Sequence, residues 1–377
     1  MIHRLKKNIK RILLKIARLV PAGNYIMFES VPDFSDSPKA VFDEMLARGY
    51  DKKYKFIWWL YDENKPHPQL PNSVYVKGKN VLQFWWYVLR SKCLISCNRF
   101  LGTYTNNQVS VYITHGTPIK DMCGGYCVPE NVDYVIVTTE HIKPILASQL
   151  RADPNKVYAL GYPRNDMLQQ TCDLHACFPG NYKKFIVWYP TFRQHKNGSL
   201  TGTKNALPIL HDAQQAKSLN EIAKAMGVLL VVKPHFAQDV SYIKECDFSN
   251  IKIIDDFFYT QHSISSYGFV GSCDALITDY SSIYYDYLLC NKPVAVVWED
   301  IDEYRQKPGF SVDVDYYVKG AEKIYDLQDF EHFIQNVANN IDPLVADRAE
   351  INELVNYSTD GKNSARVVDF IVEKAQL

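Results

Sequence analysis

Several common signatures of function are missing from this sequence of 377 residues. It contains no GxxxxGK[ST] segment, which excludes a P-loop nucleotide site, and no GxGxxG segment of the kind that binds dinucleotides. It also lacks the GxSxG elbow of α/β-hydrolases. Lys plus Arg and Asp plus Glu both total 42, so no excess of positive charge would attract nucleic acid. We therefore expect no nucleic-acid partner.

The cysteine content is too sparse for a disulfide scaffold. The 9 cysteines are an odd number and are scattered from Cys93 to Cys290, which favours a reducing, cytoplasmic compartment. Cys93 and Cys97 resemble a zinc-binding pair, as do Cys123 and Cys127. However, residues four apart on a predicted strand lie about 13 Å from each other, too far to share one ion. We therefore expect no metal site.

Acidic residues are absent from the start of the chain, before Glu29. Residues 1–20, MIHRLKKNIKRILLKIARLV, place apolar side chains at three- and four-residue steps, and Lys and Arg occupy most of the remaining surface. The segment has neither the apolar core of a secretory signal nor the roughly 20 apolar residues of a spanning helix. The pattern is typical of a helix in the interface of an anionic membrane. A helix packed on the protein's own core is the alternative.

A second apolar stretch, VLQFWWYVLR at 81–90, contains four consecutive aromatic residues. It is too short to span a bilayer. It predicts a helix of the protein core, with an aromatic contact at a membrane interface as the alternative.

Short apolar runs alternate with helical patterns along the rest of the chain. Such near-continuous apolar runs are typical of parallel strands that helices cover on both faces. The mixed polar segment 169–184 interrupts the alternation and predicts the connection between two domains. We therefore expect an α/β protein with two doubly wound, Rossmann-like domains, an N-terminal one at 21–170 and a C-terminal one at 180–377.

Unusual polar residues follow four of the predicted strands. They are found in HGTPIK (115–120), in YPTFR (189–193), at His235, and in the segment 278–282. In open α/β sheets, ligands bind where strands end and helices begin. Because two of these strand ends belong to each half of the chain, we expect one cleft between the two domains.

The segment 276–297 has the composition of an anion site. The hydroxyls of Thr278, Ser281 and Ser282 and the free amides of the helix that starts there could bind a pyrophosphate. An ordinary helix cap, for which Asp and Ser are favoured, is the alternative. Asp279 lies in the same turn, and Asp286 lies about one helical turn further on, where it would fix the loop or contact a ligand hydroxyl.

Basic residues at the other strand ends complete the candidate site. Arg193, near Thr191, is a natural phosphate partner, because its guanidinium is planar and permanently charged. His235 would stabilise charge that develops on a leaving phosphate. His115 is followed by Gly116, which permits a close approach of the backbone. A structural role is the alternative for a lone histidine after a strand.

Five motifs resemble one known family. HGTPIK, GYPRND (161–166), YPTFR, KPHF and ITDYSSIYYDY occur in the same order as in the CDP-glycerol glycerophosphotransferase family of teichoic-acid primases and polymerases. The resemblance covers about residues 95 to 300, with a weaker echo at DGKNSARVVDFI (360–371). It implies the two-domain GT-B fold, a polyprenyl-linked or capsular glycan acceptor at the cytoplasmic membrane face, and no cofactor beyond a CDP-glycerol or CDP-ribitol donor.

The resemblance also implies roles for single residues. His115 is expected to be the general base that deprotonates the acceptor hydroxyl, and His235 to contact the donor pyrophosphate. Lys120 and Arg164 would add positive potential to the cleft. The remaining expected pyrophosphate ligands are Arg193, Thr191, Thr278, Ser281 and Ser282.

The sequence departs from the family in two places. Lys233-Pro234-His235 stands where many members have Arg-x-His, and PGFSVDVDYYVKG (308–320) stands where a Pro-Gly-Pro element is common. The identity of donor and acceptor is therefore left open. A short chain favours a primase or a single-addition capsule enzyme. A GT-B glycosyltransferase that uses a nucleotide-sugar and an inert membrane-bound scaffold are the alternatives.

Overall fold

The structure is a computed structural model that describes residues 19–62, 64, 67–122, 124–191, 207–235 and 238–377. The chain forms two compact units. The first consists of 1–117, 124–166 and 357–377, and the second of 118–123 and 167–356. Each unit is described by itself below.

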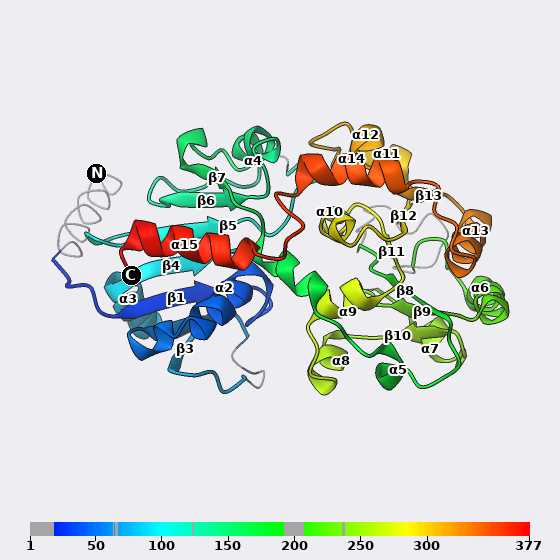
Figure 1. Cartoon of the computed structure of the whole chain (residues 1–377), viewed down its shortest axis with the longest axis horizontal. Helices are drawn as coiled ribbons and strands as arrows, with labels where there is room; N and C mark the ends of the chain where they lie inside the picture. Colours follow the sequence, from blue (N-terminus) through cyan, green and yellow to red (C-terminus); the bar gives the residue numbers. More distant parts are fainter. Residues whose placement is uncertain (1–18, 63, 65–66, 123, 192–206, 236–237) are drawn as a thin grey trace, which may run out of the picture. The chain divides into compact units, whose positions relative to one another are not determined.

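The first unit contains a seven-stranded parallel sheet with the order β3-β2-β1-β4-β5-β6-β7 (Figure 1). Successive side chains of its apolar strands point to opposite faces of the sheet, and both faces are buried, as in parallel sheets that are covered on both sides. The strands are β1 (Tyr25–Glu29), β2 (Lys55–Leu60), β3 (Ser73–Lys77), β4 (Ser91–Ser96), β5 (Val109–Ile113), β6 (Tyr134–Val137) and β7 (Val157–Ala159). The helices are α2 (Asp36–Ala47), α3 (Val81–Arg90), α4 (Ile142–Gln149) and α15 (Asn363–Ala375).

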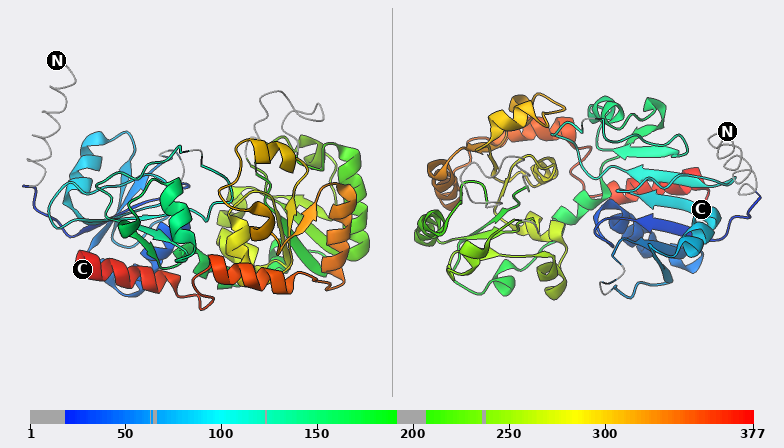
Figure 2. Two further views of the ribbon diagram at one scale, coloured as in Figure 1. Left: turned by 90° about the horizontal axis from the view of Figure 1, so that it is seen from above. Right: turned by 180° about the vertical axis from the view of Figure 1, so that it is seen from behind.

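The two cores of the first unit lie on opposite faces of this sheet. On one face, Phe28 of β1 packs in a cluster with residues of α2 and α15, including Phe42 and Ile371. On the other face, Met27 packs in a cluster with Val88 of α3. Figure 2 shows α15 along one side of the strands and α3 on the other. The alternation of neighbouring residues on β1 between the two cores explains the continuous apolar run in the sequence.

The second unit contains a six-stranded parallel sheet with the order β10-β9-β8-β11-β12-β13. Its strands are β8 (Lys184–Trp188), β9 (Val228–Val232), β10 (Ile251–Ile253), β11 (Ala275–Thr278), β12 (Val294–Val297) and β13 (Glu322–Ile324). Its helices of four to seven residues are α5 (Leu174–Cys177), α7 (Ser241–Lys244), α8 (Asp256–Gln261), α9 (Ser266–Ser272), α10 (Ile283–Tyr287), α11 (Ile301–Gln306) and α12 (Val314–Tyr317). The longer helices are α6 (Ala213–Met226), α13 (Leu327–Ala338) and α14 (Val345–Val355).

The domain limits differ from the prediction, and residues 118–123 already belong to the second unit. The last 21 residues, 357–377, belong to the first unit, because α15 packs against α2 and the first sheet. The chain passes from the first unit to the second at Asp166 and Met167, within the 3-10 segment Pro163–Gln169. The segment 169–184, which the sequence analysis assigned to the connection, is therefore part of the second unit.

Candidate active site

Both sheets have the strand order of a doubly wound fold, in which the order reverses once. The reversal lies between β1 and β4 in the first unit and between β8 and β11 in the second. Ligands of such folds bind outside the carboxyl ends of the strands at this point. The described contacts of the predicted site residues cluster around these strand ends.

A buried carboxylate joins the two strands at the reversal in the first unit. Glu29, the last residue of β1, is 1% exposed. Its Oε2 accepts hydrogen bonds from the amides of Cys97, Asn98 and Arg99, just after β4, at 3.3, 3.1 and 3.0 Å. Burial raises the pKa of the Glu29 carboxyl, and these amide hydrogen bonds oppose the shift. Sequence reasoning missed Glu29, although an acidic residue at the end of the apolar run YIMFE was a usable signal.

His115 follows β5, the strand next to β4, and its side chain is exposed to solvent. Its Nδ1 lies 3.1 Å from the carbonyl oxygen of Cys97. A carbonyl oxygen only accepts hydrogen bonds, so Nδ1 carries the proton in this contact. The neutral ring then has its free lone pair on Nε2. An exposed, fixed imidazole of this tautomer has the geometry of a general base.

The backbone of His115 is fixed from a second direction. Arg164 Nη1 donates a hydrogen bond of 2.8 Å to the His115 carbonyl oxygen. Arg164 is 3% exposed, and the same Nη1 lies 3.0 Å from a carboxylate oxygen of Asp36. The predicted contribution of Arg164 to the positive potential of a cleft stays a prediction, and the structure adds that its charge is buried and paired with Asp36. The next residue, Gly116, has φ of +147°, a conformation that side chains rarely adopt.

Residues 118–121, which belong to the second unit, pair with another loop of that unit far along the chain. The amide of Ser311 donates to the Ile119 carbonyl at 2.9 Å, and the amide of Asp121 donates to the Gly309 carbonyl at 3.0 Å. Lys120, which is half-buried, forms an antiparallel bridge with Phe310 between these bonds. The loop 309–311 belongs to the region where the sequence departs from the family pattern. The backbone of loop 309–311 hydrogen-bonds to the segment that carries Lys120.

A second buried carboxylate joins the two strands at the reversal in the second unit. Asp279, just after β11, is 1% exposed. It accepts hydrogen bonds from the amide of Thr191 at 2.7 Å, from the Thr191 hydroxyl, and from the amide of Tyr280 at 2.6 Å. Thr191 follows β8, so Asp279 ties the two strand ends together as Glu29 does in the first unit. The contacts of Thr191 with Asp279 fix the chain at the end of β8.

Thr278, the last residue of β11, is bonded to the backbone of a neighbouring strand end. Its side chain is fully buried, and its hydroxyl donates to the carbonyl of Tyr189 at 3.1 Å. The predicted role of Thr278 as a pyrophosphate ligand stays a prediction, and the structure adds that its hydroxyl is engaged with the backbone. Ser281 and Ser282 are half-buried and stand at the start of α10, where the sequence placed them. Asp286 of α10 is 1% exposed and accepts a hydrogen bond of 2.7 Å from the Tyr267 hydroxyl, which fits the loop-fixing role.

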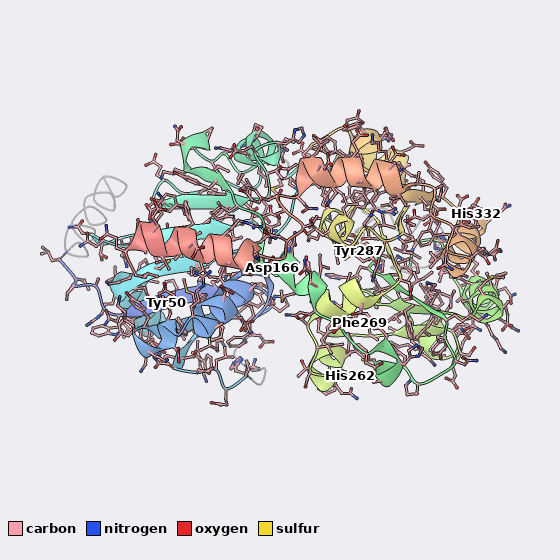
Figure 3. The ribbon with its side chains drawn as sticks, in the orientation of Figure 1. Tyr50, Asp166, His262, Phe269, Tyr287 and His332 are labelled. Carbon is pink, nitrogen blue, oxygen red and sulfur yellow. The ribbon has the colours of Figure 1, made fainter. Side chains whose placement is uncertain are left out.

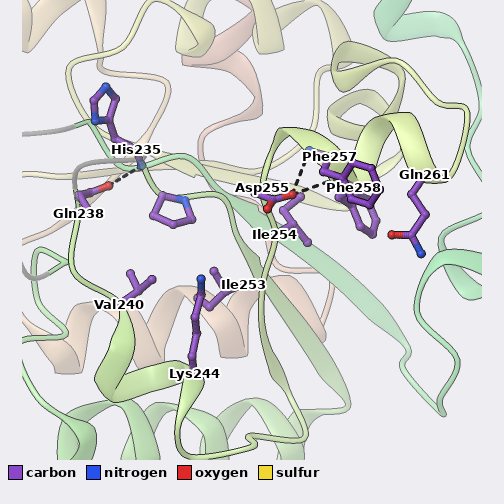
Figure 4. A pocket seen from close by; sticks show the side chains of 11 residues that line it. His235, Gln238, Val240, Lys244, Ile253, Ile254, Asp255, Phe257, Phe258 and Gln261 are labelled. Carbon is purple, nitrogen blue, oxygen red and sulfur yellow. Dashed lines mark hydrogen bonds between the residues drawn. The ribbon is translucent and has the colours of Figure 1, made fainter. Parts of the chain in front are cut away.

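His235 lies at the end of β9, at the edge of a pocket of about 320 Å³ (Figure 4). Its side chain is exposed, and its backbone amide donates to Gln238 at 2.7 Å. Two causes lower the pKa of the His235 imidazole: partial burial is the larger, and the positive charge of Lys233 is the smaller. In Figure 4, Asp255 and Phe257 lie on the opposite side of the pocket from His235, and Asp255 accepts the amides at the start of α8. The volume is in the range of small-molecule sites.

The remaining observations concern Arg193, Lys233, metal sites and membrane-spanning helices. Arg193 lies outside the residues that the structure describes, as does the segment 1–18. Lys233 forms an ion pair with Asp256 at 2.9 Å. Within the described residues, no three His, Cys, Asp or Glu side chains are arranged to hold a metal ion, and no helix is long and apolar enough to cross a bilayer.

Two doubly wound units, each with polar side chains at the reversal of its sheet, define the GT-B class of fold. The fold is similar to that of a solved structure, "Structure of the Wall Teichoic Acid Polymerase TagF", with a TM-score of 0.77, 20% identity, and coverage of 100% of this chain and 98% of that chain. The family model of CDP-glycerol:poly(glycerophosphate) glycerophosphotransferase matches residues 12–373. The chain therefore belongs to this family, which the sequence motifs predicted.

Curated relatives in the family carry names from teichoic acid synthesis. The chain is 26% identical over 319 residues to a teichoic acid poly(glycerol phosphate) polymerase of Staphylococcus epidermidis, covering 74% of this chain and 41% of the relative. It is also 26% identical over 255 residues to a teichoic acid ribitol-phosphate primase of Bacillus spizizenii, covering 65% of this chain and 60% of the relative. The matched regions thus span about half the length of these two relatives.

Proposed function

We propose that this protein transfers a polyol phosphate, glycerol phosphate in the first instance, from a CDP-activated donor to a hydroxyl of a lipid-linked or capsular glycan, with release of CMP. The observation that carries the proposal is the fixed tautomer of His115. Its Nδ1 contacts the Cys97 carbonyl, so Nε2 is available to accept a proton from the acceptor. Membership of the glycerophosphotransferase family supports the choice of donor.

In the proposed reaction, Nε2 of His115 takes the proton of the acceptor hydroxyl as its oxygen attacks the phosphorus that bears the polyol. A new P–O bond forms, the bond from that phosphorus to the bridging oxygen breaks, and the electron pair leaves with CMP. The negative charge in the transition state lies on the phosphoryl oxygens, so cationic and hydrogen-bonding groups supply most of the rate. The reaction needs no cofactor beyond the donor.

The donor pyrophosphate is proposed to bind at the strand ends of the second unit. His235 and Arg193 would contact it through charge-assisted hydrogen bonds, and the exposed parts of Ser281 and Ser282 would add neutral donors. The pocket beside His235 offers room for the nucleoside of the donor. Thr191 and Asp279 are proposed to fix the end of β8 through their mutual hydrogen bonds rather than to touch the phosphates.

The decisive experiment measures CMP release from CDP-glycerol and from CDP-ribitol in the presence of a lipid-linked disaccharide. Wild type is compared with His115→Ala and with a control variant, His332→Ala, whose imidazole is exposed on α13. The expected result is release that depends on the acceptor and is lost only in His115→Ala. Turnover of a UDP- or GDP-sugar with neither CDP donor would instead assign a glycosyltransferase. Absence of turnover with all donors would favour a scaffold.

The proposed location is the cytoplasmic face of the cell membrane, through the basic amphipathic segment 1–20. Each basic residue near an anionic surface contributes on the order of 1 kcal/mol to binding. A protein that lacks residues 1–20 is expected to bind less to anionic vesicles while it keeps its melting temperature. Equal binding by the full and shortened chains would contradict this role of the segment.

A further inference from the structure

Two cysteines near the start of the second unit face each other. The Sγ atoms of Cys172 and Cys177 lie 3.8 Å apart, which is the contact distance of two thiols. Both cysteines are free and half-buried. The sequence analysis considered zinc at two other cysteine pairs and gave this pair no role. The proposed transfer reaction uses neither sulfur, so the pair is available for chemistry of its own.

The chain around Cys172 is fixed against α9. The amide of Cys172 donates to the Ser272 hydroxyl at 2.8 Å. At Gly271 of α9, a Cβ would lie 2.1 Å from the carbonyl oxygen of Leu168, so only glycine permits this close approach of the two backbones. The position of the first sulfur is therefore set by the packing of the chain on α9.

The position of Cys177 is set from the other side. It is the last residue of α5, a single helical turn in which the Asp173 carboxylate accepts the amide of Ala176 at 3.1 Å. The next residue, Phe178, stacks on Phe258 of α8 with ring centroids 5.1 Å apart. A disulfide has an S–S distance of about 2 Å, so the two sulfurs must approach each other by about 1.8 Å. Rotation of the two side chains and a small movement of one helical turn supply a shift of this size.

Solvent can reach this pair of thiols. Four neighbouring residues in the chain are exposed: Thr171, Asp173, His175 and Ala176. Burial is the larger cause that raises the pKa of the Cys172 thiol to about 12, and its hydrogen bond to Cys177 is the next. Because the thiolate is the reactive form of cysteine, Cys177 is the sulfur that reacts first with a reagent from solvent.

We propose that Cys172 and Cys177 form a reversible disulfide by exchange with a low-molecular-weight disulfide such as oxidised glutathione. Cys177 loses its proton to water and attacks one sulfur of the reagent, whose S–S bond breaks as one thiol leaves. Cys172 then loses its proton and attacks the sulfur of Cys177, and the second thiol leaves. The two protein thiols are oxidised, and one reagent disulfide is reduced to two thiols.

The expected consequence is a second unit that is braced under oxidising conditions. In a reducing compartment the pair is held as two thiols, so the bond forms when that balance shifts. The bond joins the end of α5 to the chain that packs on α9, and a cross-link of this kind restricts the unfolded chain. A single helical turn has little stability of its own, so α5 gains most from the cross-link. This inference goes beyond the proposed transfer reaction and does not depend on it.

The test treats the folded full chain at neutral pH with mixtures of oxidised and reduced glutathione, blocks the remaining thiols with iodoacetamide, and analyses tryptic peptides by mass spectrometry. Residues 165–183 form one tryptic peptide, and its two cysteines are Cys172 and Cys177. The expected result is that this peptide loses the mass of two hydrogens and that dithiothreitol restores it. Cys246→Ser, which removes an exposed cysteine elsewhere in the second unit, is the matched control and is expected to keep the disulfide.

The two single variants test the order of the steps. Cys172→Ser is expected to stop at a glutathione adduct of Cys177, and Cys177→Ser to stay largely unmodified, because the pKa of Cys172 is raised. Oxidation is expected to raise the melting temperature of wild type and of Cys246→Ser by about 2–5 °C and to leave that of Cys172→Ser unchanged.

Three results would overturn the inference. The first is a wild-type peptide that stays unmodified, or that carries glutathione on both cysteines, at every ratio of oxidised to reduced glutathione. The second is a bond from either cysteine to Cys273, which is fully buried and becomes reachable only if the fold opens. The third is a lower melting temperature after oxidation, which would show that the bond strains the second unit instead of bracing it.

Discussion

The Nδ1 atom of His115 donates a hydrogen bond to the carbonyl oxygen of Cys97 at 3.1 Å. The amide of the same Cys97 donates to the buried carboxylate of Glu29. One residue of backbone therefore connects the proposed base to an acidic group at the reversal of the sheet. Because the imidazole is held at Nδ1, a substitution can be chosen that retains this contact and removes only Nε2.

His115→Asn is the variant that separates these two functions. The Asn side chain keeps a donor near the position of Nδ1 but has no counterpart to Nε2. We expect kcat for CMP release to fall by roughly 10²- to 10⁴-fold, the usual contribution of a general base. The dissociation constant of CDP-glycerol, measured by calorimetry, is expected to stay within about threefold of wild type. A large loss of donor affinity would instead place His115 at the donor.

Glu29 is expected to act on His115 through the 97–99 loop rather than on the substrate. Glu29→Ala leaves the amides of residues 97–99 without their acceptor and is expected to lower the free energy of unfolding by about 2–4 kcal/mol. In the fraction that stays folded, kcat is expected to fall while the KM for the donor is retained, because the imidazole loses its orientation. Glu29→Gln keeps an oxygen acceptor and is expected to restore most of kcat.

The pH dependence of stability distinguishes the two Glu29 variants from wild type. Since the pKa of Glu29 is raised in the folded protein, the folded state binds more protons than the unfolded state between the ordinary and the raised pKa. The free energy of unfolding therefore falls as the pH rises through this window. Urea titrations are expected to show a shallower fall for Glu29→Gln, which has no charge to bury. An identical slope in both proteins would contradict a raised pKa of Glu29 in the folded state.

Thr191 provides a comparable test in the second unit. Thr191→Val removes its hydroxyl bond to Asp279 and is expected to cost about 1–2 kcal/mol of stability, with a modest loss of donor affinity. Thr191→Ser retains the hydroxyl and serves as the control. If Thr191→Val weakened donor binding by about a hundredfold at unchanged stability, the result would assign Thr191 a direct contact with the phosphates.

His235 is expected to give donor binding a pH dependence. Its pKa is lowered in the free protein, so the ring is neutral at pH 7 and above. A bound pyrophosphate favours the imidazolium and raises this pKa, so the affinity for CDP-glycerol falls as the pH rises above the pKa of the free protein. The slope is at most about tenfold per pH unit for one proton. His235→Asn is expected to remove the slope and His332→Asn to keep it; the same slope in both variants would assign the titration elsewhere.

The sequence predicted the fold class and the strand ends well, because parallel strands and their polar termini leave local patterns. Continuous apolar runs predicted both sheets, and the motif order predicted the family. The burial and the partners of Thr278 and Arg164 were not predicted, for one common reason. Burial and pairing depend on residues far away in the chain, such as Asp36 for Arg164, and a motif does not record them. Glu29 was missed because its partners lie about 70 residues later.

Helix α3 and the C-terminal segment show a different limit of prediction from local sequence patterns. The apolar pattern of α3 was correct evidence for a helix, but a helix that is apolar all round has no polar side to indicate which face is buried. The motif at 360–371 resembles the family, but no local sequence pattern indicated that this segment returns to the first unit. That information lies in the contacts of Asp166 with the start of α15.

The Asp166 carboxylate caps α15 across almost 200 residues of chain. It accepts hydrogen bonds from the amides of Asn363 at 3.0 Å and Ser364 at 2.6 Å, at the helix N-terminus that Figure 3 shows beside the labelled Asp166. The neighbouring Gly161 has φ of +82°, and a Cβ there would lie 2.1 Å from Asn363 Oδ1. The GYPRND motif is therefore shaped to receive the end of this helix.

Asp166→Ala is expected to lower the free energy of unfolding by about 1–3 kcal/mol, because two helix amides lose a half-buried acceptor. Hydrogen exchange is expected to accelerate most in α15, whose Val367, Val368 and Ile371 lie in the core of the first unit. Asp360→Ala is the matched control, since Asp360 lies in the same turn, is 44% exposed, and forms a partly exposed ion pair with Arg366, a kind of pair that contributes little. If both variants changed exchange in α15 equally, the cap would contribute no more than a surface ion pair. If only Asp166→Ala does so, the first unit depends on the last residues of the chain for its core.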